Sequence, residues 1–557
     1  MSDVTWEPPG KGPWELETTH FGRPISFFAQ TYYSTGFVRG FSEGMARYGF
    51  LLDHLKPGIV NSFIYMQPVP FGAPEGAMKP PPAAVLKLLT RLLPKMRKRI
   101  AISAAAFENK QWRTDLKTWD EIDKPAAIAR HRAVEAVDVT ALSDDELAAH
   151  ITDYVPYGES MIYLHHKYTA TAIAVCGDFI AGVVEWTDAN PGDICLLLRG
   201  TSRISNGFAA DELDAAAKAI AVHDAARDIL LSGRPAPAML EALSADPGAG
   251  DAVRGYLDAV RYRSLGYDLG DANAGEMPDV LVGALRSTVE GRSSADDAPG
   301  VEKLRAQVPA EHLDEFDDRL AEARLVNRIR DERAAFGDGW ATGLGRRALL
   351  EAGRRLAATG KLHDAEHGVD LTPDEVIGML RGKPGPSIDE VSARHEWRTT
   401  HTIADAPPFL GAMPPAPPPV ELLPPAARRP AKAVDYMLAN LFAVAETPNT
   451  DTVLTGLAVN DGVYEGTARL VGGSEEFGRI RKGDVLVTRM TSPYFNVVLP
   501  LLGAIVTDRG GQLSHAAIVA REYGIPGIVG TRDATTTIPD GARVRVDGTT
   551  GEVHILQ

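Results

Sequence analysis

The sequence predicts a multidomain protein in which a mostly α-helical N-terminal domain precedes a small α/β domain at the C-terminus. The chain has 557 residues, more than one hydrophobic core usually organises. Several segments before position 403 carry apolar side chains at three- and four-residue spacing, which is typical of helices. After position 433, short strand-like segments alternate with a short helical one, which indicates a compact α/β module.

The clearest helical patterns in the N-terminal region occupy 212–231, 316–336 and 346–362. The last pattern ends near Gly360, and glycine at that position favours a C-terminal helix cap. Residues 246–299 are rich in Gly, Asp, Ser and Ala and show little periodicity. We expect helices joined by a loose, exposed connection there.

A proline-rich run separates the two regions. The segment from Ala406 to Pro430 reads APPFLGAMPPAPPPVELLPPAARRP. Prolines at this density remove backbone donors and favour extended polyproline geometry, so we expect a semi-rigid spacer on which one domain can travel. The predicted domains are therefore 1–402, a linker over 403–432, and 433–557.

The C-terminal module is expected to contain five strand segments and one short helix. The strand-like segments are 462–471, 483–490, 503–508, 524–530 and 542–556, and the last should form a hairpin turning at 547–551. The helix is expected from the string SHAAIVAREYG, because its apolar residues follow helical spacing and its glycine can end the helix.

Composition excludes several classes of function. A formal charge of −16 opposes binding to nucleic acids, and the most basic segment, 91–100, is read as a solvated helix face. No apolar run is long enough to predict a membrane span, and the N-terminus does not resemble a signal peptide. The only cysteines, Cys176 and Cys195, lie in apolar contexts, so we expect core packing and no metal site. The expected location is the cytoplasm.

The string TDRGGQLSHAAIVAREYGIPGIVG, 507–530, carries the chemistry. A short strand leads to Gly510 and Gly511, and the next helix is expected to begin at Ser514 as its N-cap. His515 then lies in the first turn, beside free backbone amides and the positive end of the helix dipole, which favour a phosphoryl group. The same dipole disfavours imidazolium, so the ring is expected to stay neutral and nucleophilic. This pattern indicates covalent catalysis through a phosphorylated histidine.

A structural reading of His515 remains open from local physics alone. In that reading the histidine is a second capping residue on a helix packed against a small sheet.

The same string resembles the signature of the swivelling phosphohistidine domain in phosphoenolpyruvate synthase, pyruvate phosphate dikinase and rifampin phosphotransferase. The matching positions are Gly510, Gly511, Ser514, His515, Ala516, Ala517, Ala520, Arg521, Gly524, Ile525 and Pro526. The resemblance implies that His515 is phosphorylated and that the first three of these residues, with Arg521, support the phosphate and the motif. The N-terminal region resembles the substrate-binding part of the rifampin phosphotransferase group more loosely.

The resemblance also implies where ATP binds. Such enzymes need an ATP-grasp domain, and Arg292-Ser293-Ser294 lacks the loop that should follow, so we read it as an ordinary loop. The chain stops at Gln557, which is too soon for the barrel that makes phosphoenolpyruvate. The order of domains is similar to that in the phosphohistidine subunit of phenylphosphate synthase. We therefore expect ATP and Mg²⁺ on a separate ATP-grasp subunit.

A hydroxyl compound that attacks phosphohistidine needs a base and cations that neutralise the transferring charge. His165 and His166 are the only adjacent histidines, and one of them is a candidate base, with a buried structural pair as the alternative. Arg199 is a candidate cation, and an ordinary salt bridge is its alternative. Resemblance to rifampin phosphotransferase adds Arg330 and Arg346 as candidates near the transfer site. His20 and His395 are expected to be structural.

The sequence-based hypothesis is a phosphotransferase subunit that moves a phosphoryl group from ATP through His515 to a small hydroxyl substrate. Phenolic compounds or hydroxyphenyl ketones are the expected acceptors, which places the protein in aromatic compound catabolism. The alternative is a non-catalytic phosphocarrier whose N-terminal domain serves docking or regulation.

Overall fold

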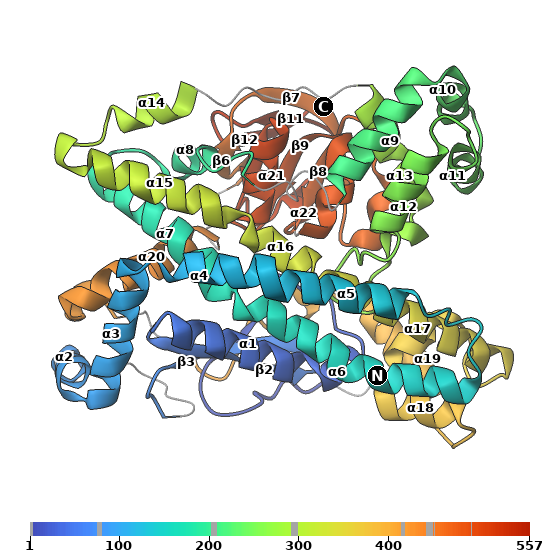
Figure 1. Ribbon diagram of the computed structural model, residues 1–557, viewed down its shortest axis with the longest axis horizontal. Helices are drawn as coiled ribbons and strands as arrows, with labels where there is room; N and C mark the ends of the chain where they lie inside the picture. Colours follow the sequence, from blue (N-terminus) through green and yellow to red (C-terminus); the bar gives the residue numbers. More distant parts are fainter. Residues whose placement is uncertain are drawn as a thin grey trace. The chain divides into compact units, whose positions relative to one another are not determined.

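The computed structural model describes residues 4–74, 81–201, 209–290, 299–413, 418–441, 449–450, 452–491 and 493–556. The chain forms two compact units. Unit 1 comprises 1–174, 267–271 and 332–432, and unit 2 comprises 175–266, 272–331 and 433–557. The predicted fold class is confirmed, because a large helical N-terminal region precedes a C-terminal mixed sheet (Figure 1).

The units do not follow the predicted division into 1–402, 403–432 and 433–557. Residues 175–266 and 272–331 group with the C-terminal sheet, because their helices share a hydrophobic core with it. Sequence periodicity identifies helices but carries no signal for which distant segment covers their apolar faces.

Unit 1 is mainly helical. Its helices within the described residues are α1 (Tyr33–Arg47), α2 (Ala83–Leu92), α3 (Pro94–Glu108), α4 (Gln111–Thr118), α5 (Lys124–Glu135), α6 (Asp144–Lys167), α17 (Asp338–Ala358), α18 (Pro373–Leu380) and α19 (Ile388–Thr400). Helices α7 (Thr169–Trp186), α16 (Ile329–Ala335) and α20 (Pro425–Leu441) cross from one unit to the other. Helix α17 contains most of the predicted 346–362 pattern, and Gly360 follows it with a φ of +71°.

A stripe of glycines brings α1 against α6, beside which it lies in Figure 1. Gly36, Gly40 and Gly44 recur every four residues and so lie on one face of α1. A Cβ placed on Gly40 would lie 2.3 Å from the carbonyl oxygen of Tyr163 on α6. The two backbones therefore approach closely because this face of α1 carries no side chains.

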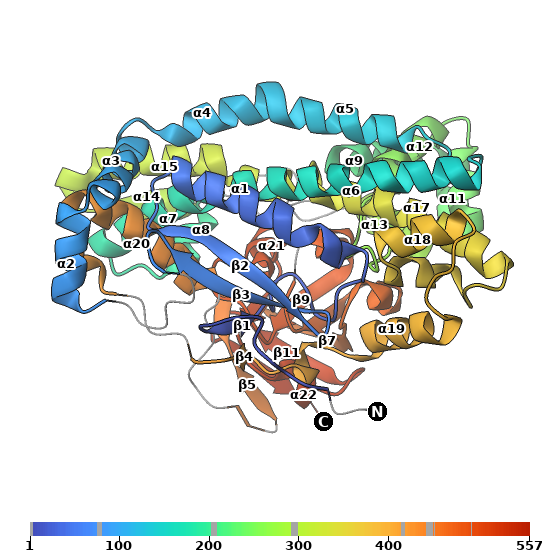
Figure 2. The same cartoon turned by 90° about the horizontal axis from the view of Figure 1, so that it is seen from below.

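The sheet of unit 1 joins segments that are distant in sequence. Its order is β2-β3-β1-β4, from β2 (Leu52–Val60), β3 (Phe63–Pro70), β1 (Trp14–Leu16) and β4 (Phe409–Leu410). All neighbours are antiparallel, and Trp14 is opposite Leu410. Figure 2 shows the first three of these strands side by side next to α1.

The proline-rich segment is therefore not a continuous extended spacer. Strand β4 pairs with the N-terminal strand β1, and α20 begins at Pro425 and contains Pro430. Residues 414–417 lie outside the described part. Proline at the start of a helix costs little, because the first amides of a helix have no internal partner.

Unit 2 contains an eight-stranded mixed sheet in the order β5-β12-β11-β7-β8-β9-β10-β6. The strands are β5 (Val453–Thr455), β6 (Leu457–Asn460), β7 (Val463–Leu470), β8 (Asp484–Thr488), β9 (Leu502–Thr507), β10 (Gly527–Val529), β11 (Arg543–Asp547) and β12 (Glu552–Ile555). The run β7-β8-β9-β10 is parallel, and the remaining pairs are antiparallel.

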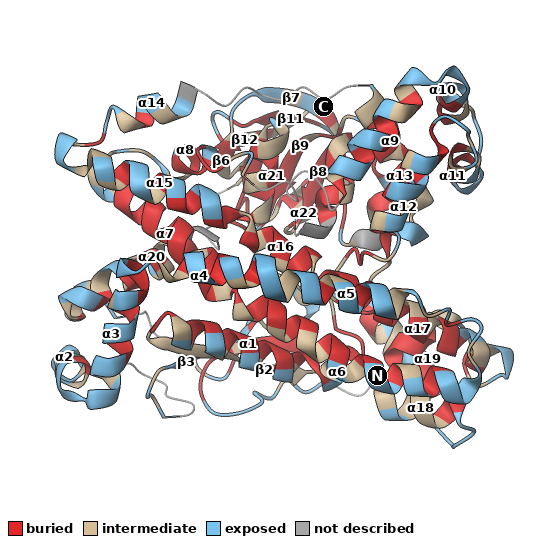
Figure 3. Cartoon of the chain, in the orientation of Figure 1, coloured by how far each residue is buried: buried red, intermediate tan, exposed pale blue. Residues whose placement is uncertain are grey.

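Alternate residues of the central strands enter two different cores. Val485 and Val487 of β8 pack on one face of the sheet, and Leu486 packs on the other, as the two-residue period of a strand requires. Both faces are covered, so β8 and β9 are nearly continuous apolar runs, and Figure 3 shows this part of the sheet as buried.

The helices of unit 2 include α8 (Pro191–Leu196), α9 (Ala210–Val222), α10 (Asp224–Leu231), α11 (Ala236–Ser244), α12 (Gly250–Val260), α13 (Pro278–Val289), α14 (Pro299–Arg305), α15 (Leu313–Asn327), α21 (His515–Tyr523) and α22 (Ala534–Thr537). The predicted helices over 212–231 and 316–336 are each interrupted, at His223 and Arg328. The region expected to be loose contains α12 and α13 with buried faces, while residues 291–298, including Arg292-Ser293-Ser294, lie outside the described residues.

The helical stretch Asp144–Trp186 is long and apolar enough to span a membrane by length and composition. It contains an 18-residue window with a mean hydropathy of 1.3. However, 72% of that window is buried inside the described protein, as is common for a core helix. Cys176 and Cys195 are free and buried, which confirms the expected core packing.

Candidate functional site

His515 is the first residue of α21, directly after the turn that follows β9. Gly510 has a φ of +109°, and a Cβ there would lie 2.8 Å from Ser514, so this turn requires glycine. The Ser514 side chain accepts a hydrogen bond from the backbone N–H of Ala517 at 3.4 Å, so Ser514 is the predicted N-cap. The helix ends at Gly524, whose φ is +64°.

Both ring nitrogens of His515 have partners. Nδ1 lies 2.9 Å from the hydroxyl of Thr491, and Nε2 lies 3.1 Å from Oδ1 of Asn496. Both partners are buried. With the Asn496 amide oriented as it is in the structure, Nε2–H donates to the amide oxygen and the Thr491 hydroxyl donates to Nδ1. This arrangement fits a neutral imidazole whose orientation is fixed.

The environment keeps the His515 ring uncharged. Burial lowers the pKa of His515 to about 3, with the positive charge of Arg330 adding to this effect and the negative charge of Asp331 opposing it. His515 as a whole residue is nevertheless only half-buried. A neutral, fixed and accessible imidazole is the form that attacks an electrophilic phosphorus atom.

Thr491 and Asn496 were missed by sequence reasoning. Both lie on the connection between β8 and β9. Strands β8 and β9 are adjacent and parallel, so the loops that leave their carboxyl ends meet at the same edge of the sheet. Recognising two consecutive parallel strands was the signal that could have placed Thr491 near His515.

Arg521 supports the turn before α21. Its guanidinium donates to the backbone oxygen of Gln512 at 2.6 Å and to the Gln512 side-chain oxygen at 2.5 Å. The side chain is almost fully buried, and that burial lowers its pKa. Arg521 therefore holds the loop between Gly511 and His515.

Arg199 contacts the far end of the same helix. Its guanidinium donates to the backbone oxygen of Glu522 at 3.2 Å, and the Gly200 amide donates to the Glu522 carboxylate at 3.0 Å. Burial raises the pKa of Glu522 to about 7. The structure thus gives Arg199 a partner at the C-terminal end of α21.

Arg330 is the candidate cation that the structure brings near His515. Its charge acts on the His515 ring, and its Nε lies 3.3 Å from the carboxylate of Asp331. Its Nη2 is buried and makes no hydrogen bond. A buried guanidinium nitrogen without a partner has hydrogen-bonding capacity available for an anion.

The remaining candidates lie in unit 1. His165 and His166 are buried, and Nδ1 of His165 lies 2.8 Å from the Asp338 carboxylate. Burial lowers the pKa of both histidines well below the usual value and raises the pKa of Asp338 to about 7. Arg346 is buried and paired with Glu366, and it donates to the backbone oxygen of Leu269 at 3.2 Å.

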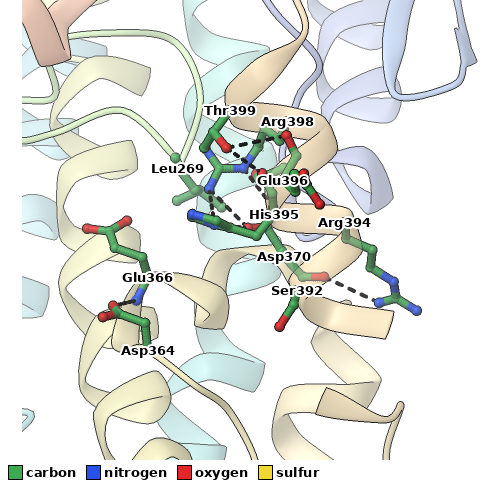
Figure 4. A network of polar contacts seen from close by, with 12 residues as sticks. Leu269, Asp364, Glu366, Asp370, Ser392, Arg394, His395, Glu396, Arg398 and Thr399 are labelled. Atoms are coloured by element: carbon green, nitrogen blue, oxygen red, sulfur yellow. Dashed lines mark hydrogen bonds and ion pairs between the residues drawn. The ribbon is translucent and has the colours of Figure 1, made fainter. Parts of the chain in front are cut away.

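A separate buried network contains His395. Figure 4 shows His395 and Arg398 on α19 pointing toward Asp370. Arg398 donates to the two Asp370 oxygens at 2.7 and 3.0 Å, and His395 Nδ1 lies 2.9 Å from the same carboxylate. Asp370 is fully buried, and its three contacts with Arg398 and His395 satisfy the charge. This network joins α19 to the segment before α18, as expected for a structural histidine.

Comparison with known proteins identifies the C-terminal part. Residues 480–551 match the family model described as "PEP-utilising enzyme, mobile domain". The uncharacterized phosphotransferase YvkC of Bacillus subtilis is 33% identical over 228 residues, 41% of this chain and 26% of that protein. A rifampicin phosphotransferase of Streptomyces sviceus is 28% identical over 346 residues, 57% of this chain and 36% of the relative.

A phosphoenolpyruvate synthase of Aeropyrum pernix is 45% identical over 108 residues, 19% of this chain and 13% of the relative. This chain therefore spans about a third or less of the length of each of these relatives.

Proposed function

Since residues 480–551 belong to the mobile-domain family of PEP-utilising enzymes, we propose that this protein is a phosphotransferase that works through phosphorylated His515. The observation that carries the proposal is the neutral His515 ring at the start of α21, held by Thr491 and Asn496. Relatives named as phosphotransferases support the same reaction class.

Phosphorylation of His515 needs one ring nitrogen with a free lone pair. As that nitrogen attacks phosphorus, the bond from phosphorus to the donor breaks and its electron pair leaves with the donor. The partner of the attacking nitrogen must then give way, while the other nitrogen keeps its hydrogen bond. The first amides of α21 and the guanidinium of Arg330 can neutralise charge on the transferring group.

We propose ATP as the phosphoryl donor, bound with Mg²⁺ on a separate ATP-grasp subunit. This proposal rests on the resemblance in domain order. Mg²⁺ would neutralise the nucleotide phosphates on that subunit. Purification of the full-length chain with an interacting ATP-grasp protein, followed by ATP-dependent labelling of His515, tests it. The proposed location of the complex is the cytoplasm.

The proposed acceptor is a small hydroxyl compound, phenolic or a hydroxyphenyl ketone. Among the candidate cations, Arg330 has the best support, because Arg346 pairs with Glu366 and Arg199 contacts the end of α21. Burial of His165 and His166 favours structural roles for both rings over direct contact with an acceptor. Any swing of His515 between donor and acceptor would carry unit 2 as a whole, because residues 433–557 share a hydrophobic core with 175–331.

Phosphoramidate provides a test that does not need the partner subunit, because it phosphorylates nucleophilic imidazoles. The full-length chain should gain acid-labile phosphate at His515, as mapped by mass spectrometry, and His515→Ala should lose it. His554→Ala is the matched control, because His554 is a partly exposed histidine of the same unit paired with Glu552. Equal labelling of His515→Ala and wild type would refute the proposal.

The acceptor half of the reaction separates an enzyme from a phosphocarrier. Labelled protein is mixed with phenol or 4-hydroxyacetophenone, and the phosphorylated product is followed by ³¹P NMR. Formation of an aryl phosphate supports the enzyme. Stable phosphohistidine with both compounds would favour the alternative, a carrier that passes its phosphoryl group only to another protein.

A further inference from the structure

His20 is held in a fixed orientation by a buried carboxylate. The Glu17 side chain accepts hydrogen bonds from the backbone amides of Thr19, His20 and Phe21 at 2.9–3.2 Å. The same carboxylate lies 2.9 Å from Nδ1 of His20. Nδ1–H is therefore the donor, which leaves the lone pair on Nε2. The His20 side chain is 33% exposed, whereas that of Glu17 is 8% exposed.

An aromatic row leads from His20 into the core of unit 1. It consists of Tyr267, Phe21, Tyr33, Phe37, His166 and His165. Tyr267 meets the His20 ring edge-on, with centroids 4.7 Å apart. The later members follow through contacts with centroid distances of 4.2–6.2 Å. The outer end of this row is half-exposed at Tyr267, while its inner members are buried.

Burial weakens the charges at the inner end of the aromatic row. His165 pairs with Asp338, burial lowers the pKa of His165, and burial raises the pKa of Asp338 to about 7. His20 is near enough for its charge to act on both groups. The nearby cation of Arg333 donates to the His165 carbonyl and to Thr169. The half-exposed Tyr267 ring beside the partly exposed His20 side chain offers an aromatic contact and an imidazole to a neutral ring that carries a hydroxyl group.

We propose that His20, oriented by Glu17, is the base that removes the proton from an aromatic hydroxyl acceptor whose ring packs against Tyr267. The inference rests on the proposed function, because the acceptor takes the phosphoryl group of His515. It assigns the base to a residue that the sequence pattern favoured as structural. His165 and His166 are 3% and 8% exposed, and in this assignment they support the aromatic row.

The hydroxyl proton moves to Nε2 of His20 while the hydroxyl oxygen forms a bond to phosphorus. The phosphorus–nitrogen bond of phosphohistidine breaks, and its electron pair remains on the His515 ring. Because the other ring nitrogen of His515 has kept its proton, the ring is released as neutral imidazole, and His20 passes the hydroxyl proton to water. The products are an aryl phosphate and the two original histidines.

The decisive variant is His20→Asn in the full-length chain. The asparagine amide can still donate to Glu17, but it cannot act as a base. His54→Asn is the matched control, because His54 of the same unit pairs with Asp53 at 3.0 Å and is 21% exposed. After loading with phosphoramidate, His20→Asn should keep phosphohistidine at His515. Transfer to phenol should fall about 100-fold or more, the range for loss of a general base, and His54→Asn should match wild type.

Binding of phenol beside His20 can be tested without measuring phosphoryl transfer. Diethyl pyrocarbonate acylates exposed imidazoles, and mass spectrometry reports the modification of His20 and His54 in one sample of wild-type protein. Phenol should slow modification of His20 several-fold and leave His54 unchanged. If phenol protects neither histidine, or if His20→Asn transfers phosphate as fast as wild type, the inference is overturned.

Different results would refute the phosphorylation of His515 and the assignment of His20 as the base. Absence of phosphohistidine at His515 refutes the proposed function, while protection of His20 by phenol would still support an aromatic site. Normal labelling of His515 and aryl phosphate formation, with no effect of His20→Asn, would refute the assignment of His20 alone.

Discussion

Replacing Gly510 with alanine should loosen the start of α21 and misplace His515. Gly510 has a φ of +109°, which an L-residue adopts only at a cost of about 1–3 kcal/mol. The added methyl group would lie 2.8 Å from Ser514. Ser514 must then move and weaken its cap on Ala517, which costs about 0.5–2 kcal/mol more. The expected total is about 1.5–5 kcal/mol.

Gly541→Ala separates the two contributions. Gly541 also has a positive φ, +83°, but no atom lies within 4 Å of a Cβ at that position. This variant should therefore bear the backbone cost alone. The difference between the variants reports the loss of the Ser514 cap, and it should be confined to the first turn of α21.

Hydrogen exchange of the α21 amides is the appropriate assay, because it measures local opening in a chain with two units. A loss of 0.5–2 kcal/mol corresponds to exchange about 2- to 30-fold faster at the Ala517 amide. Phosphoramidate labelling of His515 should slow in Gly510→Ala and remain at the wild-type rate in Gly541→Ala. Equal exchange and equal labelling in the two variants would refute the reasoning that links the turn to His515.

Further predictions concern the packing of Gly40, the protonation of His515 and the role of Arg330 in the labelling of His515. Gly40→Ala should lower the melting temperature by several degrees, because its Cβ would lie 2.3 Å from the Tyr163 carbonyl oxygen and overpacking costs ~1–3 kcal/mol. Gly255→Ala is the control and should not lower the melting temperature, because nothing lies within 4 Å of a Cβ at that position. Because the pKa of His515 is lowered to about 3, its phosphoramidate labelling should persist from pH 8 to pH 5. Free N-acetylhistidine loses ~97% of its neutral form over that range, and a parallel decline would contradict the lowered pKa. Arg330→Gln should slow labelling at least ~10-fold, and it should also lower the melting temperature, because the buried Asp331 carboxylate loses its cation. An unchanged labelling rate at a temperature where the variant is folded would remove Arg330 from the site.

The start of α21 could be predicted because its signals are local. A glycine pair, Ser514 as N-cap and Gly524 as C-cap lie within one short string, and each acts on its immediate neighbours. The same holds for the buried strands β8 and β9, whose apolar runs identify a sheet covered on both faces.

Contacts between residues that are distant in sequence explain the features that the sequence did not predict. The proline-rich segment was expected to be extended throughout, yet Phe409 and Leu410 pair with β1 near the N-terminus. No local pattern indicates such a partner. Arg346 and Arg199 stay predictions as substrate contacts, and their partners Glu366 and Glu522 come from segments distant in sequence that no local pattern identifies. Candidate residues for binding can therefore be proposed from sequence, but their competing partners cannot.

The shared core of unit 2 has a consequence for dissecting the protein. Buried residues from α9–α13, such as Leu213, Leu243 and Leu285, belong to one cluster with Phe477 and Leu499 of the C-terminal segment. A gene fragment that begins at Ala433 would leave those apolar side chains without their covering, at ~1.5–3 kcal/mol for each large side chain exposed. Such a fragment should aggregate or recruit a second copy, although its sequence looks like a complete module. Grafting this module onto another protein would need residues 175–331 as well, so the transferable unit is discontinuous in the gene.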